Sequence, residues 1–154
     1  MVAILQYSGI LWYSGNKSIV KLSSFKEQKK CFTKNNSMNF KEKIEDLIKL
    51  ILSGKQMDAF EKYYHEDVVM QENSNPPMAG KSANREREIQ MMQMIETFHG
   101  AQVNAVSVGD NVTMVEWEFD VTYKGAPRMK MCQVAVQKWK DGKIIHERFY
   151  YSTN

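Results

Sequence analysis

Glu72 is the residue best placed by sequence to do chemistry, because it ends a short strand-like segment at residues 67–72. Val68 and Met70 share its parity there, and side chains two residues apart on a strand point to the same face. If both face the core, Glu72 points the same way. Desolvation at the rim of an apolar pocket raises the pKa of a carboxylate toward the range useful for proton transfer at neutral pH. We therefore predict that Glu72 faces a pocket with a raised pKa and is a candidate for moving a proton.

Glu147 is a second candidate catalytic residue, because the alternation of residues 143–151 turns it inward. Two carboxyls in one pocket without water shift each other's pKa values apart. Other interpretations stay open for both residues. Glu72 is also compatible with a solvated position at the edge of a loop, and Glu147 with a role as hydrogen-bond partner of Tyr63 or Tyr151.

A meander of three strand-like runs at residues 111–151 is the element that must position these acids. Gly-Ala-Pro at residues 125–127 marks its first turn, and Asp-Gly at residues 141–142 is the strongest hairpin signal in the sequence. A weaker strand pattern at residues 101–108 precedes it. In the first run, apolar residues alternate with polar ones, as on a strand with one buried face. These apolar residues are Val115, Trp117, Phe119, Val121 and Tyr123.

Helices before residue 111 must cover the apolar face of this meander. Asn39 can cap a helix that Gly54 ends, with apolar residues at spacings of three and four between them. A shorter helix is predicted at about residues 56–64, and a third begins at Ser82 or Asn84. The third helix carries one apolar stripe of Met91, Met94, Ile95 and Phe98. The order of helices and strands indicates an α+β domain.

Composition limits the classes of partner. Residues 1–37 hold six lysines and one acid, whereas the whole chain has 21 Lys and Arg against 18 Asp and Glu, so the remainder is mildly acidic. This removes the main support for nucleic-acid binding. No apolar run approaches the roughly 20 residues that a membrane span requires. The two cysteines lack C-x-x-C spacing, which favours a reducing, cytoplasmic compartment and argues against a zinc site.

No metal or cofactor is predicted, because the three histidines are scattered and no glycine-rich phosphate loop occurs. The chain is expected to divide at Met38. Residues 1–37 are expected to be an extension outside the core, since they show no periodic apolar face and no features of a secretory signal. Residues 38–154 are expected to form the domain. The alternative for residues 1–37 is a basic arm that docks on a partner.

Three short motifs and their order resemble the nuclear transport factor 2-like superfamily, especially its SnoaL-like and ketosteroid isomerase-like branches. The motifs are Tyr-His-Glu-Asp-Val-Val-Met-Gln-Glu at residues 64–72, Gly-Lys-Ser-Ala at residues 80–83 and Asp-Gly-Lys-Ile at residues 141–144. The likeness covers about residues 38–151. It implies a cone, in which a strongly curved antiparallel sheet and three helices enclose a pocket. It also implies a homodimer, because members of this superfamily commonly pair through the outer face of the sheet.

The resemblance assigns side chains to the two faces of the sheet. Gapless spacing from Gly125 to Gly142 turns Cys132, Val134 and Val136 toward the pocket, whose expected ligand is a small apolar molecule. The outer face is expected to carry Glu116, Glu118, Asp120, Gln133, Gln137, His146 and Arg148. The expected substrate-binding residues are Tyr63, Met70, Met91, Met94, Trp117, Phe119, Tyr123, Val134, Phe149 and Tyr151.

Departures from the family patterns limit the activity. The isomerases carry their general-base carboxylate where this chain has Glu72, but their acid–tyrosine pair falls on Val134 and Leu47, which cannot donate a hydrogen bond to an enolate. Steroid isomerase activity in its usual form is therefore not expected. The acid that SnoaL cyclases carry after the final aromatic pair falls on Ser152. The arginine-flanked acids of the epoxide hydrolases of this fold are not evident, because Arg148 should point outward.

Three functions remain open. The first is a cofactor-independent isomerase, cyclase or hydrolase for a small apolar carbonyl or polyketide-like substrate, with Glu72 moving the proton. The second is a small-molecule binding protein without chemistry, and the third is a protein-interaction module that uses the outer sheet face. A Tyr, Asp, Arg or His within reach of Glu72 inside the pocket would favour the enzyme over the binder.

Removing residues 1–37 should leave folding intact, because they lack a periodic apolar face and differ in charge from the rest. The thermal midpoints of the full chain and of a chain starting at Met38 should agree. A drop of more than about 5 °C, on the order of 1 kcal/mol or more for a chain of this size, would show that the extension docks on the domain.

Overall fold

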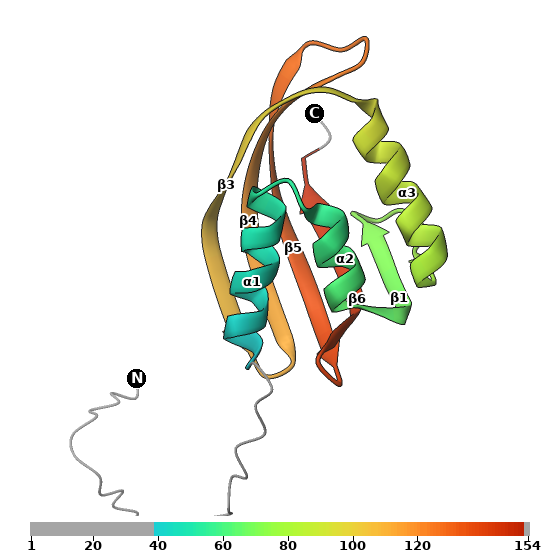
Figure 1. Ribbon diagram of the computed structural model, residues 1–154, viewed down its shortest axis with the longest axis vertical. Coiled ribbons are helices and arrows are strands. Elements are labelled where there is room, and N and C mark those ends of the chain that lie inside the picture. Colours follow the sequence, from blue (N-terminus) through green and yellow to red (C-terminus); the bar gives the residue numbers. More distant parts are fainter. Residues whose placement is uncertain (1–38, 153–154) are drawn as a thin grey trace, which may run out of the picture. The chain divides into compact units, whose positions relative to one another are not determined.

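Three helices lie against one side of a six-stranded sheet in the computed structural model, which describes residues 39–152 (Figure 1). The expectation that residues 1–37 form an extension falls outside the described residues. Among residues 39–152, no helix is both long and apolar enough to cross a membrane. The elements are α1 (Phe40–Leu52), α2 (Gln56–Tyr63), β1 (Tyr64–Glu72), β2 (Met78–Ala79), α3 (Lys81–Met94), β3 (Ile95–Gly109), β4 (Val112–Tyr123), β5 (Arg128–Lys140) and β6 (Lys143–Tyr151).

The strand order in the sheet is β2-β1-β6-β5-β4-β3. The four strands from β3 to β6 pair antiparallel with their neighbours in the chain, as predicted. β1 joins the far side of β6 in parallel, so the sheet is mixed. The predicted α+β architecture, a curved sheet with three covering helices, is confirmed, although the sheet was predicted to be antiparallel and the β1–β6 pair is parallel. The parallel pairing of β1 with β6 places Glu72 beside the strand that carries Glu147.

Local signals explain where α1 begins. The backbone N–H of Glu42 donates to Asn39 Oδ1 at 2.9 Å, and the backbone N–H of Asn39 donates to Glu42 Oε2 at the same distance. This reciprocal pair satisfies two of the N–H groups that a helix start leaves free. Ile44 and Leu47, one turn apart, are buried against the sheet. The helix therefore covers the pocket with its apolar face.

The end of α3 differs from the prediction. The helix stops at Met94, and Ile95 and Phe98 belong to β3 rather than to a helical stripe. The ladder between β3 and β4 decides this, since it starts at the pair Ile95 and Tyr123. Register irregularities interrupt this ladder at three points, one of them next to Gly100. Such bulges bend a strand, and the long β3 curves around the helices (Figure 1).

The register between β4 and β5 decides which side chains face the helices. Trp117, which is buried, pairs with Gln133, and Thr113 pairs with Gln137. Directly paired residues on neighbouring strands point to the same face of a sheet. The prediction that Gln133 and Gln137 lie on the outer face is therefore wrong, because both point toward the helices.

The same register places the even-numbered residues of β5 on the outer face. Val134 pairs with Glu116, and Cys132, which is exposed, pairs with Glu118. The prediction that Cys132, Val134 and Val136 line the pocket is therefore wrong. The error arose because β5 carries valines outside and glutamines inside, the reverse of the usual pattern for a strand with one solvated face.

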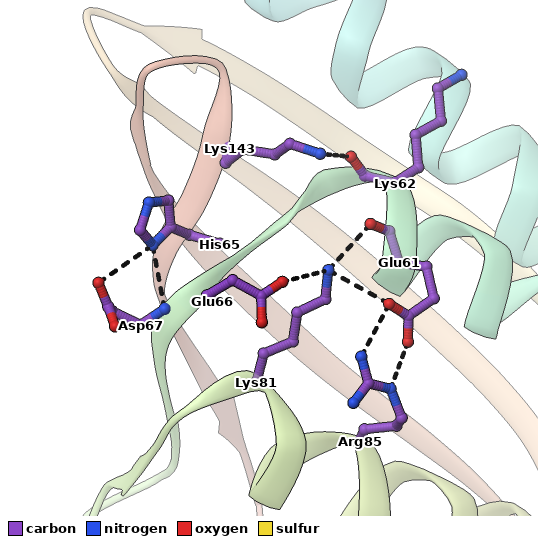
Figure 2. Close-up of polar contacts among 8 residues, drawn as sticks. All are labelled: Glu61, Lys62, His65, Glu66, Asp67, Lys81, Arg85 and Lys143. Atoms are coloured by element: carbon purple, nitrogen blue, oxygen red, sulfur yellow. Dashed lines mark hydrogen bonds and ion pairs between the residues drawn. The ribbon is translucent and has the colours of Figure 1, made fainter.

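A buried lysine joins α2, β1 and α3 (Figure 2). Lys81, in the first turn of α3, donates from Nζ to the backbone oxygen of Glu61 at 3.0 Å. Its Nζ also lies 3.3 Å from the Glu61 carboxylate and 3.5 Å from that of Glu66. Arg85, one turn further along α3, pairs with the same Glu61 carboxylate. These contacts hold the first turns of α3 against the junction of α2 and β1, and so set the position of the next residues of the helix.

We propose that the chain forms a homodimer through the outer face of the sheet, where half-buried and exposed apolar side chains meet. Met114 pairs with Val136, and Val134 pairs with Tyr150. Met114 and Tyr150 are 43% and 45% exposed. A stable two-fold contact should bury on the order of 1,200 Å² or more in total. Light scattering at micromolar concentration should give the dimer mass, and Val134→Lys, which puts a charge into the contact, should shift it toward the monomer. A monomer mass for the unchanged chain would contradict this proposal.

Candidate active site

A cavity of about 650 Å³ lies between the three helices and the inner face of the sheet. Its wall is mostly apolar, with rings from β4 and β6 and methionines from α2 and α3. A pocket of this size and lining suits a small, largely apolar molecule. The predicted residues that line it are Met70, Glu72, Met91, Trp117, Phe119, Tyr123, Glu147, Phe149 and Tyr151.

Three predicted substrate-binding residues do not line the cavity. Tyr63 is buried elsewhere and donates from its hydroxyl to Asp46 Oδ2 at 2.6 Å. Met94, the last residue of α3, is 59% exposed. Val134 lies on the outer face, as the β4–β5 register requires. In each case a difference of one residue decides which way the side chain points. The end of a helix or the register of a strand sets that position.

Glu72 reaches the cavity from the end of β1, and its side chain is 22% exposed. It is therefore not a freely solvated residue at a loop edge. Burial raises the pKa of its carboxyl above the ordinary value, while Arg87 and the neighbouring Tyr151 hydroxyl act in the opposite direction. Arg87 Nη2 lies 3.6 Å from Glu72 Oε1. Glu72 thus combines partial desolvation with a nearby cation that keeps the charged form accessible.

Arg87 and Glu88 line the cavity from α3, and the sequence analysis did not single them out. Arg87 Nη2 lies 3.2 Å from Glu88 Oε1 as well as near Glu72, so the guanidinium sits between two carboxylates. Burial raises the pKa of Glu88, and Arg87 opposes that rise. A sequence signal existed, since Glu88 lies three residues before Met91 and Arg87 lies four residues before it. Residues at these spacings share one face of a helix.

Arg87 corrects the expectation that the pocket lacks an arginine flanked by acids. That expectation considered only Arg148, which does point away from the cavity and donates from Nε to the backbone oxygen of Asn73 at 2.9 Å. The arginine that enters the cavity comes from a different element, α3. An arginine in reach of Glu72 is one of the groups that distinguish an enzyme pocket from a simple apolar one.

Glu147 is the most enclosed acid of the cavity wall, with 2% of its surface exposed. Tyr64 donates from its hydroxyl to Glu147 Oε2 at 2.5 Å, and Gln137 donates from Nε2 to Oε1 at 2.8 Å. Its partner is therefore Tyr64, and neither Tyr63 nor Tyr151. Burial raises the pKa of Glu147 to about 7, although both hydrogen bonds favour the charged form. A carboxyl with this pKa exchanges its proton near neutral pH.

The Tyr64–Glu147 pair supplies what the sequence analysis found missing, a donor beside an acid inside the pocket. The expected positions for such a pair were Leu47 and Val134. Leu47 does line the cavity, but Val134 does not. Tyr64 lies at the start of β1 and Glu147 in the middle of β6. The charged groups therefore gather along β1, β6 and α3, while the rest of the wall is mostly apolar apart from glutamines of α2 and β5. This distribution would orient a substrate that has one polar end.

A family model described as the SnoaL-like domain matches residues 38–151. The chain belongs to the SnoaL-like family. The resemblance to the nuclear transport factor 2-like superfamily is thereby confirmed. No curated protein matches the sequence of this SnoaL-like chain.

Solved structures share this SnoaL-like fold. A candidate SnoaL-like polyketide cyclase from Mesorhizobium loti is 32% identical, with 74% of this chain and 100% of that chain covered and a TM-score of 0.67. A protein of ketosteroid isomerase-like fold from Catenulispora acidiphila, in complex with trimethylamine, is 16% identical over 73% and 86% of the chains, with a TM-score of 0.61. An epoxide hydrolase of M. tuberculosis is 15% identical over 71% and 80%, with a TM-score of 0.58. The last two likenesses concern the fold alone.

The raised pKa of Glu147 should make stability depend on pH. The folded protein holds a proton up to about pH 7, whereas the unfolded chain releases it near the ordinary value of 4.5. The contribution of Glu147 to the free energy of unfolding is therefore fully present below about pH 4.5. This contribution is lost as the pH rises through about 7, which lowers the free energy of unfolding by roughly 3 kcal/mol. Urea unfolding of Glu147→Gln, which cannot titrate, should show most of this fall removed.

The matched control is Glu45→Gln, which changes an exposed acid of α1. It should keep the pH dependence of the unchanged protein. Equal pH dependence in all three proteins would show that Glu147 does not hold a proton in the folded state.

Proposed function

We propose that this protein is a cofactor-independent acid–base enzyme for a small, largely apolar carbonyl or polyketide-like substrate. The observation that carries the proposal is the presence, in one apolar cavity, of a half-buried carboxylate, Glu72, and of a fully buried acid–tyrosine pair, Glu147 and Tyr64. The candidate polyketide cyclase named for the M. loti relative supports the same substrate class.

Glu72 is the proposed base. Desolvation makes its carboxylate more basic than a free one, and Arg87 at 3.6 Å limits this rise in the pKa. When Glu72 removes a proton from the carbon next to a carbonyl, the C–H electrons become an enolate and negative charge develops on the carbonyl oxygen. That charge needs a donor in a dry site. The hydroxyl of Tyr64, backed by Glu147, is the proposed donor.

The reaction would finish by returning the proton. For an isomerisation, Glu72 gives its proton back to a different carbon. For a cyclisation, the enolate carbon attacks a second carbonyl of the same molecule, and the alkoxide that forms on that carbonyl oxygen takes the proton from Glu72. In both cases Glu72 ends in the charged form in which it began. No cofactor or metal takes part in this scheme.

Hydrolysis is a second candidate reaction, and one observation favours it. Arg87 lies between the carboxylates of Glu72 and Glu88, with its Nη2 3.6 Å and 3.2 Å from them. One carboxylate could accept a proton from water while the other, if protonated, donates to the leaving oxygen. The M. tuberculosis neighbour is named an epoxide hydrolase, which supports testing epoxides alongside carbonyl compounds. Simple binding without chemistry is the alternative if neither class reacts.

Glu72→Gln should keep the fold and the ligand affinity but lose turnover by about 100-fold or more, because the amide has the same shape and cannot accept the proton. Deuterium uptake next to the carbonyl of small cyclic ketones and 1,3-diketones, followed by NMR in D₂O, measures proton removal without knowledge of the natural substrate. Ligand binding can be followed by the fluorescence of Trp117, which lines the cavity.

Glu45→Gln again serves as the matched control and should exchange deuterium at the rate of the unchanged protein. Equal exchange by the unchanged protein and Glu72→Gln would remove Glu72 from the mechanism. Binding of these ketones without any exchange or epoxide opening would leave the non-catalytic binding protein as the better description.

A further inference from the structure

A continuous line of buried hydrogen bonds runs from Glu147 across the sheet and away from the cavity. Gln137 Nε2 donates to Glu147 Oε1 at 2.8 Å, and Thr113 Oγ1 donates to Gln137 Oε1 at 2.8 Å. Trp139 Nε1 then donates to Thr113 Oγ1 at 2.8 Å. Thr113, Gln137 and Trp139 are at most 4% exposed. Gln137 lines the cavity, but Thr113 and Trp139 are not among the lining residues, so their part of the line calls for an explanation of its own.

The donor-to-acceptor direction of these hydrogen bonds follows from the chemistry of Trp139, the member farthest from Glu147 along the line. An indole N–H can only donate, so Thr113 Oγ1 accepts from Trp139 and must use its own hydrogen elsewhere. Its neighbour in the line is the Gln137 amide, which can accept that hydrogen only through Oε1. The amide of Gln137 is thereby turned with its oxygen toward Thr113 and its NH₂ toward Glu147. The donor on one side and the acceptor on the other therefore both fit this orientation of the amide.

We propose that Thr113 and Trp139 are positioning residues that, through Gln137, confine the proton of Glu147 to Oε2, the oxygen that faces Tyr64. Oε1 faces an N–H donor and has no room for a hydrogen of its own. The catalytic meaning of this inference rests on the proposed acid–base function, but the position of the proton does not.

The position of the Glu147 proton determines where the Tyr64 hydroxyl hydrogen points. While Glu147 is charged, Tyr64 donates to Oε2 across 2.5 Å. Once Oε2 carries a proton, that O–H donates to the Tyr64 oxygen, and the tyrosine's own hydrogen must turn elsewhere. Tyr64 lines the cavity, so its hydrogen is then available to a substrate oxygen. If the substrate oxygen takes this hydrogen, the Oε2 proton moves to Tyr64, and the net change is one proton from Glu147 to the substrate.

Burial is the largest influence on the pH at which this exchange occurs, and the charged groups around Glu147 adjust it. Glu88 on α3 and Glu72 on β1 favour the protonated form, as does burial, while the Tyr64 and Gln137 hydrogen bonds favour the charged form. Arg87 on α3 lies between those two acids and weakens their effect. The balance places the pKa near 7. Removing the Gln137 donor from Oε1 should tip this balance toward the protonated form.

Thr113→Val tests the proposal because valine has the shape of threonine without the hydroxyl. Gln137 then loses the donor that holds its oxygen away from Glu147, and the amide can turn to accept a proton from Oε1. A carboxyl ¹³C titration of Glu147 by NMR should show its pKa raised by at least about one pH unit relative to the unchanged protein. Thr113→Ser keeps the hydroxyl and should titrate like the unchanged protein.

Trp139→Phe is the second variant, in case Thr113→Val does not fold. It keeps an aromatic ring beside Phe40 and removes the N–H together with part of the indole ring system. Thr113 can then accept from Gln137 instead of donating to it, so the pKa of Glu147 should again rise. In a Gln137→Leu background, where the donor to Oε1 is already gone and the pKa already raised, Trp139→Phe should add no further rise. An unchanged titration in folded Thr113→Val and Trp139→Phe would overturn the proposal and leave the line a structural feature.

The titration separates this inference from the proposed function. It needs no substrate, so a raised pKa supports the positioning role even if every deuterium-exchange assay is negative. If the unchanged protein does exchange deuterium, Thr113→Val should move the pH profile of exchange in the direction of its titration, and Thr113→Ser should not. Deuterium exchange that depends on Glu72 with no response to Thr113→Val would keep the enzyme proposal and discard this one.

Discussion

The enclosure of one carboxyl, Glu147, is the constraint on which much of this structure depends. A buried acid is tolerated only if its oxygens are hydrogen-bonded or its charge is removed by a proton. Both happen here, since Tyr64 and Gln137 each donate to one oxygen while burial still raises the pKa to about 7. Leaving either oxygen without its partner would cost about 1–3 kcal/mol. The partners must therefore be held, and β1 and β5 flank β6 to hold them.

The same requirement explains the unusual polarity of β5. An inward glutamine at 137 would be unfavourable in an apolar cavity wall, but Thr113 and Glu147 satisfy its amide on both sides. The apolar residues Val134 and Val136 then fall on the outer face, where a half-buried valine pair is poorly suited to water. The strand β5 thus contributes to two surfaces. Its inner face takes part in the line of buried hydrogen bonds, and its outer face belongs to the proposed dimer contact.

Arg87 connects the remaining acids to this arrangement. Arg87 lies on α3, and the contacts of Lys81 hold the first turns of α3 against α2 and β1. These contacts fix the position at which the Arg87 guanidinium enters the cavity. Without a cation, Glu72 and Glu88 would raise each other's pKa in a partly desolvated site. Arg87 opposes the rise in pKa at both carboxyls. Similar folds host different reactions, so the identity of such polar groups, and not the cone itself, decides the chemistry.

The local elements of the fold could be read from the sequence alone. The cap at Asn39, the alternation of β4 and the turn at Asp141 depend on neighbours within a few residues, and all three occur as predicted. Glu72 and Glu147 could be placed at the pocket for the same reason, since parity along one strand is a local property. Most of the aromatic wall also follows from alternation in single strands.

The tertiary structure decided what depends on register and on partners far apart in the chain. A shift of one residue between β4 and β5 exchanges the two faces of a strand, and no local signal shows which pairing occurs, so Val134 was misplaced. The bond from Tyr64 to Glu147 joins residues 83 positions apart, and Arg87 meets Glu72 only because α3 packs against β1. Sequence determined which groups were available, whereas packing determined which of them met, because hydrogen bonds and charges act over a few ångströms in space and not along the chain.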